Sequence, residues 1–124
     1  MLKRFRLRHT ADFERLNSEG KRWHHSLAVL IVRPNELGIN RFGFTTSKRV
    51  GRAVDRNYAK RRFREAVRRR LGEVRTGWDC LFIIKPKSRR ASSREVEHAV
   101  RGLLDQAGLI IGSESEDRIG NQQY

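Results

Sequence analysis

Apolar residues along this chain gather in short runs separated by polar or turn-forming segments. The runs at 27–32 and 80–84 are almost continuous, and the segment 41–47 alternates apolar with polar positions and is rich in β-formers. Runs of this length and composition predict strands. We therefore expect strands at 27–32, 41–47 and 79–85, and the short segment 21–25 is a further candidate.

Other segments space their apolar residues by three and four, which predicts amphipathic helices. The first helix is expected over 10–19 with Thr10 as its N-cap, and the last from Ser92 or Ser93 to about 106. Between them a helix from Ala53 to about Leu71 carries one apolar stripe. The stripe consists of Ala59, Phe63, Ala66 and Val67. The order helix, strands, helix, strand, helix predicts an α+β fold with helices packed on a small mixed sheet.

The chain has 124 residues, enough for one domain with a single core. We assign this domain to residues 1–111. Residues 112–124 are polar and are expected to form a disordered tail. No internal repeat or interdomain linker interrupts the sequence.

Positive charge is concentrated in residues 48–70. This stretch holds eleven Lys or Arg residues against two acids, Asp55 and Glu65, and supplies +9 of the formal net charge of +14. Such a density needs an anionic partner, and a sequence pI near 11.4 points the same way.

Helical geometry divides this basic stretch into two faces. At about 100° per residue, a group of polar side chains falls in one wedge beside the apolar stripe. We call this group the cationic face: Asn57, Lys60, Arg61, Arg64 and Arg68. The alternative, a face that is merely solvated, is disfavoured because such faces usually mix both signs of charge. The pattern favours nucleic acid, whose phosphates Arg and Lys neutralise.

The other polyanion, a membrane surface, is poorly supported. No run approaches the roughly 18 apolar residues of a spanning helix, and the basic N-terminus lacks the apolar core of a signal peptide. The single cysteine, Cys80, lies in a strand-like run and is expected to be a buried structural thiol. We therefore expect a cytoplasmic protein with no membrane partner.

Residues for protein-borne catalysis are missing from the sequence. The adjacent pair His24 and His25 would point to opposite faces of a strand, and His9 and His98 stand apart. The sequence has no phosphate-binding glycine loop and no nucleophile elbow. We expect no catalytic residue and no metal ligand in the protein.

A second binding surface is conceivable between the first helix and the sheet. Phe13, with Ile31 and Thr45 or Ser47, could line a groove where single-stranded bases stack. Composition alone favours the alternative, in which Phe13 packs in the core.

Residues 51–65, GRAVDRNYAKRRFRE, resemble the signature of the protein subunit of bacterial ribonuclease P. Supporting matches lie at 6–8 with 12–13, at 18–21, at 43–44 with 47–49, and at 84–86. The resemblance extends over roughly residues 4–107.

The resemblance implies a two-layer sandwich of order αβββαβα, similar to a ribosomal-protein fold, with a left-handed βαβ crossover. It also implies an accessory subunit without an obligate protein partner. Its RNA subunit, with magnesium held mainly by that RNA, removes the 5′ leader of precursor tRNA. The residues implied for catalytic RNA are Arg52, Arg56, Asn57, Lys60, Arg61, Arg64 and Arg68. Those implied for the leader are Phe13, Asn17, Ile31, Thr45 and Ser47.

Two positions depart from the family pattern. Tyr58 stands where the motif usually has Arg, and Arg62 and Arg69 project from the same side and could compensate. Asn17 stands where a second aromatic is common.

The sequence leaves three functions to distinguish: the ribonuclease P subunit, a ribosomal or general RNA-structure protein, and a protein enzyme that itself cuts RNA.

Overall fold

The computed structural model describes residues 6–7 and 9–112, so the predicted tail lies outside the described residues except for Gly112. The order of helices and strands is αβββαβα, as predicted. The elements are α1 (Thr10–Glu19), β1 (Lys21–His24), β2 (Ala28–Pro34), β3 (Arg41–Thr46), α2 (Ala53–Arg68), β4 (Trp78–Ile84) and α3 (Ser93–Gln106), with short 3-10 helices η2 (Lys48–Val50), η3 (Leu71–Glu73) and η4 (Pro86–Arg90).

The four strands form one mixed sheet in the order β1-β2-β4-β3. β1 pairs with β2, and β2 with β4, in antiparallel fashion, whereas β3 and β4 are parallel neighbours. Because parallel strands need a long crossover, α2 carries the chain from β3 back to β4. The predicted mixed sheet is confirmed, and the left hand of the crossover stays a prediction.

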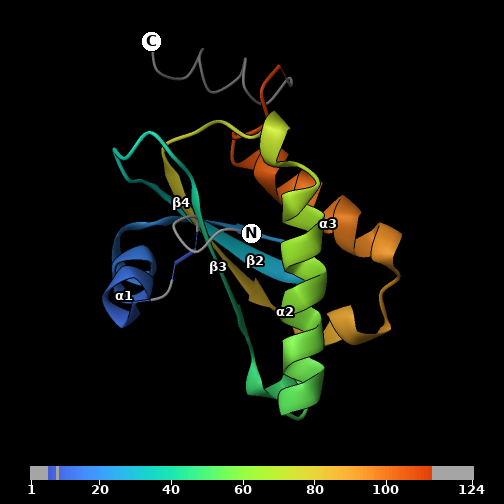
Figure 1. Cartoon of the computed structure of the whole chain (residues 1–124). Coiled ribbons are helices and arrows are strands. Elements are labelled where there is room, and N and C mark those ends of the chain that lie inside the picture. The colour runs from blue at the N-terminus through green and yellow to red at the C-terminus, as the bar shows by residue number, and fades with distance from the viewer. Residues whose placement is uncertain (1–5, 8, 113–124) are drawn as a thin grey trace.

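Helices cover both faces of the sheet. Alternate residues of β2 divide between two apolar clusters: Leu30 and Val32 pack with α2 and α3, whereas Val29 and Ile31 pack with Leu16 of α1. Figure 1 shows α1 on the opposite side of the sheet from α2 and α3. Burial on both faces explains why β2 reads as an unbroken apolar run.

Several predicted boundaries are displaced by one to three residues, and the N-cap of α1 is His9 instead of the predicted Thr10. α2 ends at Arg68 instead of near Leu71. The residues that follow form turns and then the 3-10 helix η3, which already contains Gly72. β3 ends at Thr46 because the hydroxyl of Ser47 accepts a hydrogen bond from the Arg49 N–H (3.2 Å) and begins η2.

Within 6–7 and 9–112, none of the helices is both long enough and apolar enough to cross a membrane.

Candidate nucleic-acid interface

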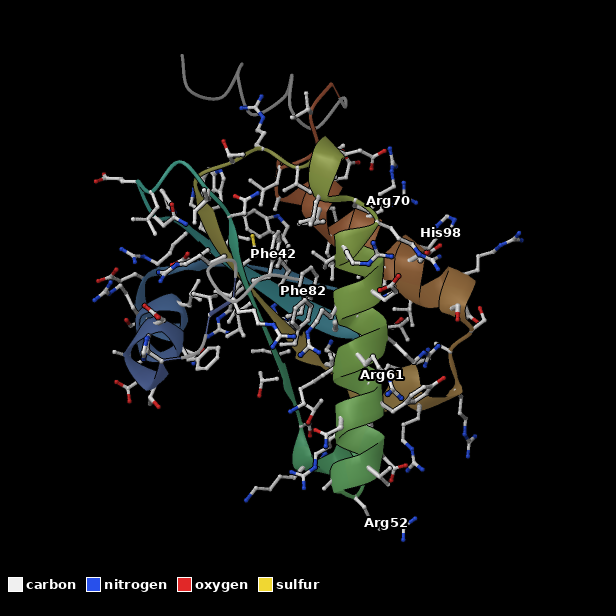
Figure 2. The ribbon with its side chains drawn as sticks, in the orientation of Figure 1. Phe42, Arg52, Arg61, Arg70, Phe82 and His98 are labelled. Carbon is white, nitrogen blue, oxygen red and sulfur yellow. The ribbon has the colours of Figure 1, made fainter. Side chains whose placement is uncertain are left out.

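The predicted apolar stripe anchors α2 against the sheet and α3. Ala59, Phe63, Ala66 and Val67 are all buried, and the Phe63 ring lies 6.2 Å from that of Phe82 in β4. The first turn is fixed by the Asp55 carboxylate, which accepts a hydrogen bond from the backbone N–H of Arg52 (3.0 Å). These contacts fix α2 on the sheet, and Figure 2 shows Arg52, Arg61 and Arg70 spaced along this helix and its ends.

Arg56, Lys60 and Arg64 follow one another at four-residue spacing along the edge of α2 that faces β3. The Arg64 guanidinium lies over the Phe44 ring of β3, 5.6 Å from its centroid. Its pKa is lowered by burial and by the positive charge of Arg6. Arg61, further round the helix, lies 5.5 Å from the Tyr58 ring. In the part of the chain that the structure describes, these four cations form no ion pair with an acid.

Four other cations of the stretch are occupied within the protein, and one of them, Arg70, lies 3.3 Å from Glu73. Arg68, predicted to contact RNA, forms a two-point ion pair with Glu65, with its Nε 2.9 Å from Oε2. Arg69 contacts Glu97 of α3 at 2.6 Å. Arg62 donates hydrogen bonds to the carbonyls of Ser88 and Ala91. Arg62 and Arg69 thus brace α2 against its neighbours, and their compensation for Tyr58 stays a prediction.

The remaining predicted members of the α2 surface are exposed. Arg52 precedes the helix at its first turn, and Asn57 lies one turn on. Figure 2 shows Arg52 at that end of α2 and Arg61 midway along it.

Phe13 lies half-buried between α1 and β3. A Cβ atom added at Gly43 would come 2.8 Å from Cε1 of Phe13, so the ring packs directly over a backbone that has no side chain. Thr45 follows Gly43 on the same face of β3 and is half-buried, and Ser47 lies at the start of η2. The structure therefore brings Phe13 and Thr45 to one side of the sheet.

Two predicted groove residues are placed differently. Ile31 is 0% exposed and packs under α1, so its side chain is corrected from a surface contact to a core residue. Asn17 is exposed, but its Oδ1 accepts a hydrogen bond from Arg22 (3.0 Å), which directs it toward β1.

Sequence reasoning missed two residues beside the interface. Arg6 lies next to β3 through a parallel bridge with Phe42, and its charge acts on Arg64. Phe44 supplies the ring under Arg64 and stacks on Phe82 at 5.7 Å. Arg6 belongs to a short motif match outside α2, and Phe44 is one of several aromatics in strand-like segments, so the sequence does not place either residue beside α2.

The single cysteine lies in the core and not on the surfaces described above. Cys80 is fully buried, and burial together with the charge of Asp79 raises the pKa of its thiol, as expected of a structural cysteine. In 6–7 and 9–112, no three His, Cys, Asp or Glu residues are grouped so that they could hold a metal ion.

Known proteins resemble this chain over most of its length. The family model described as Ribonuclease P matches residues 1–108. The ribonuclease P protein component of Herpetosiphon aurantiacus is 41% identical over 118 residues, covering 93% of this chain and 96% of the relative. That of Roseiflexus castenholzii is 36% identical over 117 residues, with 94% and 96% covered.

Solved structures agree with the fold. The RNase P protein from Thermotoga maritima has a TM-score of 0.74 and 31% identity, covering 80% of this chain and 94% of that one. An RNase P protein from Staphylococcus aureus, at 24% identity, supports the fold alone, with a TM-score of 0.79 and 86% and 97% covered.

Proposed function

Because the chain belongs to the ribonuclease P protein family, we propose that α2 binds the catalytic RNA and that the groove beside Phe13 binds the 5′ leader of precursor tRNA. Family membership makes the chain a component of a ribonuclease holoenzyme whose partner is the ribonuclease P RNA.

The observation that carries the proposal is the set of cations on α2 that have no acidic partner in the described part of the chain. These cations are Arg56, Lys60, Arg61 and Arg64, and the helix that carries them is buried on the neighbouring side, so its backbone is fixed before RNA arrives. Prepositioned cations lose little entropy on binding, and each phosphate they neutralise releases counterions. Asn57 and Arg52 extend this surface with a directional amide and a further cation.

For the leader, Phe13 and Thr45 offer an aromatic edge and a hydroxyl beside the sheet. Single-stranded RNA is bound by stacking on aromatic side chains next to a basic surface. Ser47 lies at the end of the strand that carries Thr45, toward α2. In this arrangement the groove holds the 5′ leader, while the RNA subunit holds the body of the same precursor tRNA.

The protein is proposed to assist cleavage and not to perform it. Several acids on the elements that carry the proposed surfaces are already engaged: Asp12 and Asp79 with Arg41, and Glu65 with Arg68. We assign the magnesium ions to the RNA, and we propose a cytoplasmic location, where precursor tRNA is processed. We propose that the protein has no obligate protein partner and no membrane partner.

The test reconstitutes cleavage from purified protein, transcribed ribonuclease P RNA and precursor tRNA, leaving out each component in turn. We expect cleavage to need the RNA and to be improved by the protein at low magnesium. Protein that cuts without the RNA would instead be an enzyme itself. Protein that binds ribosomal RNA but does not improve cleavage would be a general RNA-structure protein.

Variants then locate the surfaces. Arg61→Ala with Arg64→Ala should weaken binding of the RNA subunit without unfolding the protein. Phe13→Ala should reduce the preference for precursor over mature tRNA and leave affinity for the RNA subunit intact. If the double variant restored full low-magnesium cleavage, α2 would not be the RNA-binding surface.

A further inference from the structure

A basic pocket lies between η2, η4 and the start of α3, next to the first turn of α2, and no residue of the groove beside Phe13 lines it. Its volume is about 730 Å³. It is lined by Leu27, Arg49, Pro86, Lys87, Arg89, Arg90, Ala91 and Glu95. In Figure 1 the short helix η4 leads into α3 beside the N-terminal half of α2.

The charge of this pocket is strongly positive. Arg49, Lys87, Arg89 and Arg90 line it and are all exposed. The one acid in the lining, Glu95, is used by α3, because its carboxylate accepts a hydrogen bond from the Ser92 N–H (3.2 Å) in a capping box. Neighbouring Asp55 lies 3.8 Å from Arg89 and also caps α2.

The pocket has an apolar floor held in place by α2. Leu27 is 4% exposed, and its carbonyl accepts a hydrogen bond from the Lys85 N–H (2.9 Å). Arg62 donates from α2 to the carbonyls of Ser88 and Ala91, which bracket the basic end of η4. A concave site that exists before binding needs little reorganisation to receive a ligand.

We propose that this pocket binds the phosphodiester backbone of the ribonuclease P RNA, as a contact separate from the α2 surface. The proposal rests on the proposed function. Arg residues recognise phosphate oxygens through several N–H donors, and an apolar floor accommodates a ribose or base edge. The site is also continuous with α2, since Arg49 precedes Arg52 in the chain and Asp55 links the first turn of α2 to Arg89.

An anionic membrane is the competing partner. Membrane-binding surfaces combine basic residues with apolar side chains that project outward into the lipid. Here Leu27 forms the floor of a concavity and is nearly inaccessible. The geometry therefore favours a narrow chain of phosphates over a lipid surface.

The first experiment measures the salt dependence of RNA binding. The variant combines Lys87→Gln, Arg89→Gln and Arg90→Gln. Its matched control combines Arg15→Gln, Lys21→Gln and Arg101→Gln, three exposed cations on α1, β1 and α3. Both remove three positive charges. We expect only the pocket variant to reduce the slope of log affinity against log salt, by about two to three, or about one for each lost phosphate contact.

The second experiment changes one pocket residue instead of three, so it can be done even if the triple variant folds poorly. Iron–EDTA is attached to a cysteine introduced by Lys87→Cys, with Lys21→Cys as the control; Cys80 is buried and is not labelled. We expect the iron at position 87 to cleave one short stretch of the bound RNA, and the iron at position 21 to leave that stretch intact.

The two proposals fail in different ways. Equal salt slopes for the pocket variant and its control, or no localised cleavage from position 87, would overturn the pocket while leaving α2 in place. Normal RNA binding by the Arg61→Ala, Arg64→Ala variant would overturn the proposed α2 surface instead. Binding to phosphatidylserine vesicles that is lost only in the pocket variant, with RNA binding unchanged, would also overturn the RNA assignment.

Discussion

Arg41 and Asp79 form a two-point ion pair between neighbouring strands β3 and β4. Nε of Arg41 lies 2.9 Å from Oδ1 of Asp79, and Nη2 lies 2.8 Å from Oδ2. Asp79 is 1% exposed, and Asn35 donates a further hydrogen bond to its Oδ1 (2.9 Å). The same guanidinium reaches Asp12 of α1 at 3.5 Å. The pair therefore ties the helix that carries Phe13 to the sheet beneath it.

Replacing Arg41 with Ala should destabilise the protein by about 3 kcal/mol, because a buried carboxylate would lose its counter-charge. Urea unfolding measures the change. The control is Arg33→Ala, which removes an arginine paired with exposed Glu19 (3.2 Å) and should cost less than about 1 kcal/mol. Equal losses for the two variants would mean that Asn35 satisfies Asp79 unaided.

The contribution of Arg41 should not fall as the pH rises from about 7 to 9. Its pKa is raised, first by the hydrogen bond to Asp79 and also by the charges of Asp79 and Asp12. A group whose pKa is raised on folding loses its contribution only as pH rises through that raised pKa, which here lies above the ordinary arginine value. Unfolding of the wild type and of Arg41→Ala at several pH values in this range should therefore give a difference that does not fall.

Replacing Gly43 with Ala should impair the leader groove selectively. The new Cβ would lie 2.8 Å from Phe13, 3.1 Å from Leu7 and 3.2 Å from Leu81, so the Phe13 ring must move. We expect a loss of about 1 to 3 kcal/mol in unfolding free energy. The preference for precursor over mature tRNA should also fall, while affinity for the RNA subunit stays unchanged.

Gly102 provides the control for Gly43. It lies in α3 with nothing within 4 Å of an added Cβ, so Gly102→Ala should stabilise the protein by about 0.5 to 1 kcal/mol through helix propensity. Its tRNA selectivity should match the wild type. An unchanged selectivity in Gly43→Ala as well would separate Phe13 from leader binding.

The fold could largely be predicted because its signals are local. β2 and β4 are central strands buried on both faces, which leaves unbroken apolar runs, and the stripe on α2 repeats at helical spacing. The resemblance supplied the implied order of elements, which the structure confirms. The ends of α2 and β3 were less predictable, because they depend on turn hydrogen bonds that have no periodic signal.

The cationic surface was predicted as a region but not residue by residue. Helical angle assigns a side chain to a face, yet it does not reveal which acid or carbonyl lies within reach. Arg62 is directed to carbonyls 26 and 29 residues away, and Arg68 is held by Glu65 on its own helix. The surface position predicted for Ile31 is wrong because α1 covers that face of the central strand β2, which leaves Ile31 no contact with solvent.

Glu65→Gln should strengthen RNA binding. The pKa of Glu65 is lowered, first by its hydrogen bond with Arg68 and also by the charges of Arg68 and Arg69, so the carboxylate is ionised at neutral pH. Removing its charge releases Arg68 to a phosphate. The salt slope of RNA binding should increase by about one.

Glu97→Gln is the matched control, because it removes an acid that holds Arg69 on the side toward α3. The salt slope of RNA binding by Glu97→Gln should differ less from the wild-type slope than that of Glu65→Gln does. If Glu65→Gln left the slope unchanged, Arg68 would not belong to the RNA-binding surface, and its ion pair would be purely structural.

Tyr58→Arg should also strengthen RNA binding, by restoring a cation where the family motif has one. Tyr58 is 53% exposed, and the guanidinium groups of Arg61 and Arg62 lie 5.5 and 5.4 Å from its ring. Arg62 donates to the carbonyls of Ser88 and Ala91, so Arg61 is the cation beside this ring that has no acidic partner among the described residues. An arginine there should raise the salt slope by about one. Tyr58→Phe is the control and should bind as the wild type does, whereas weaker binding by both Tyr58→Arg and Tyr58→Ala would mean that the ring itself stacks on a base.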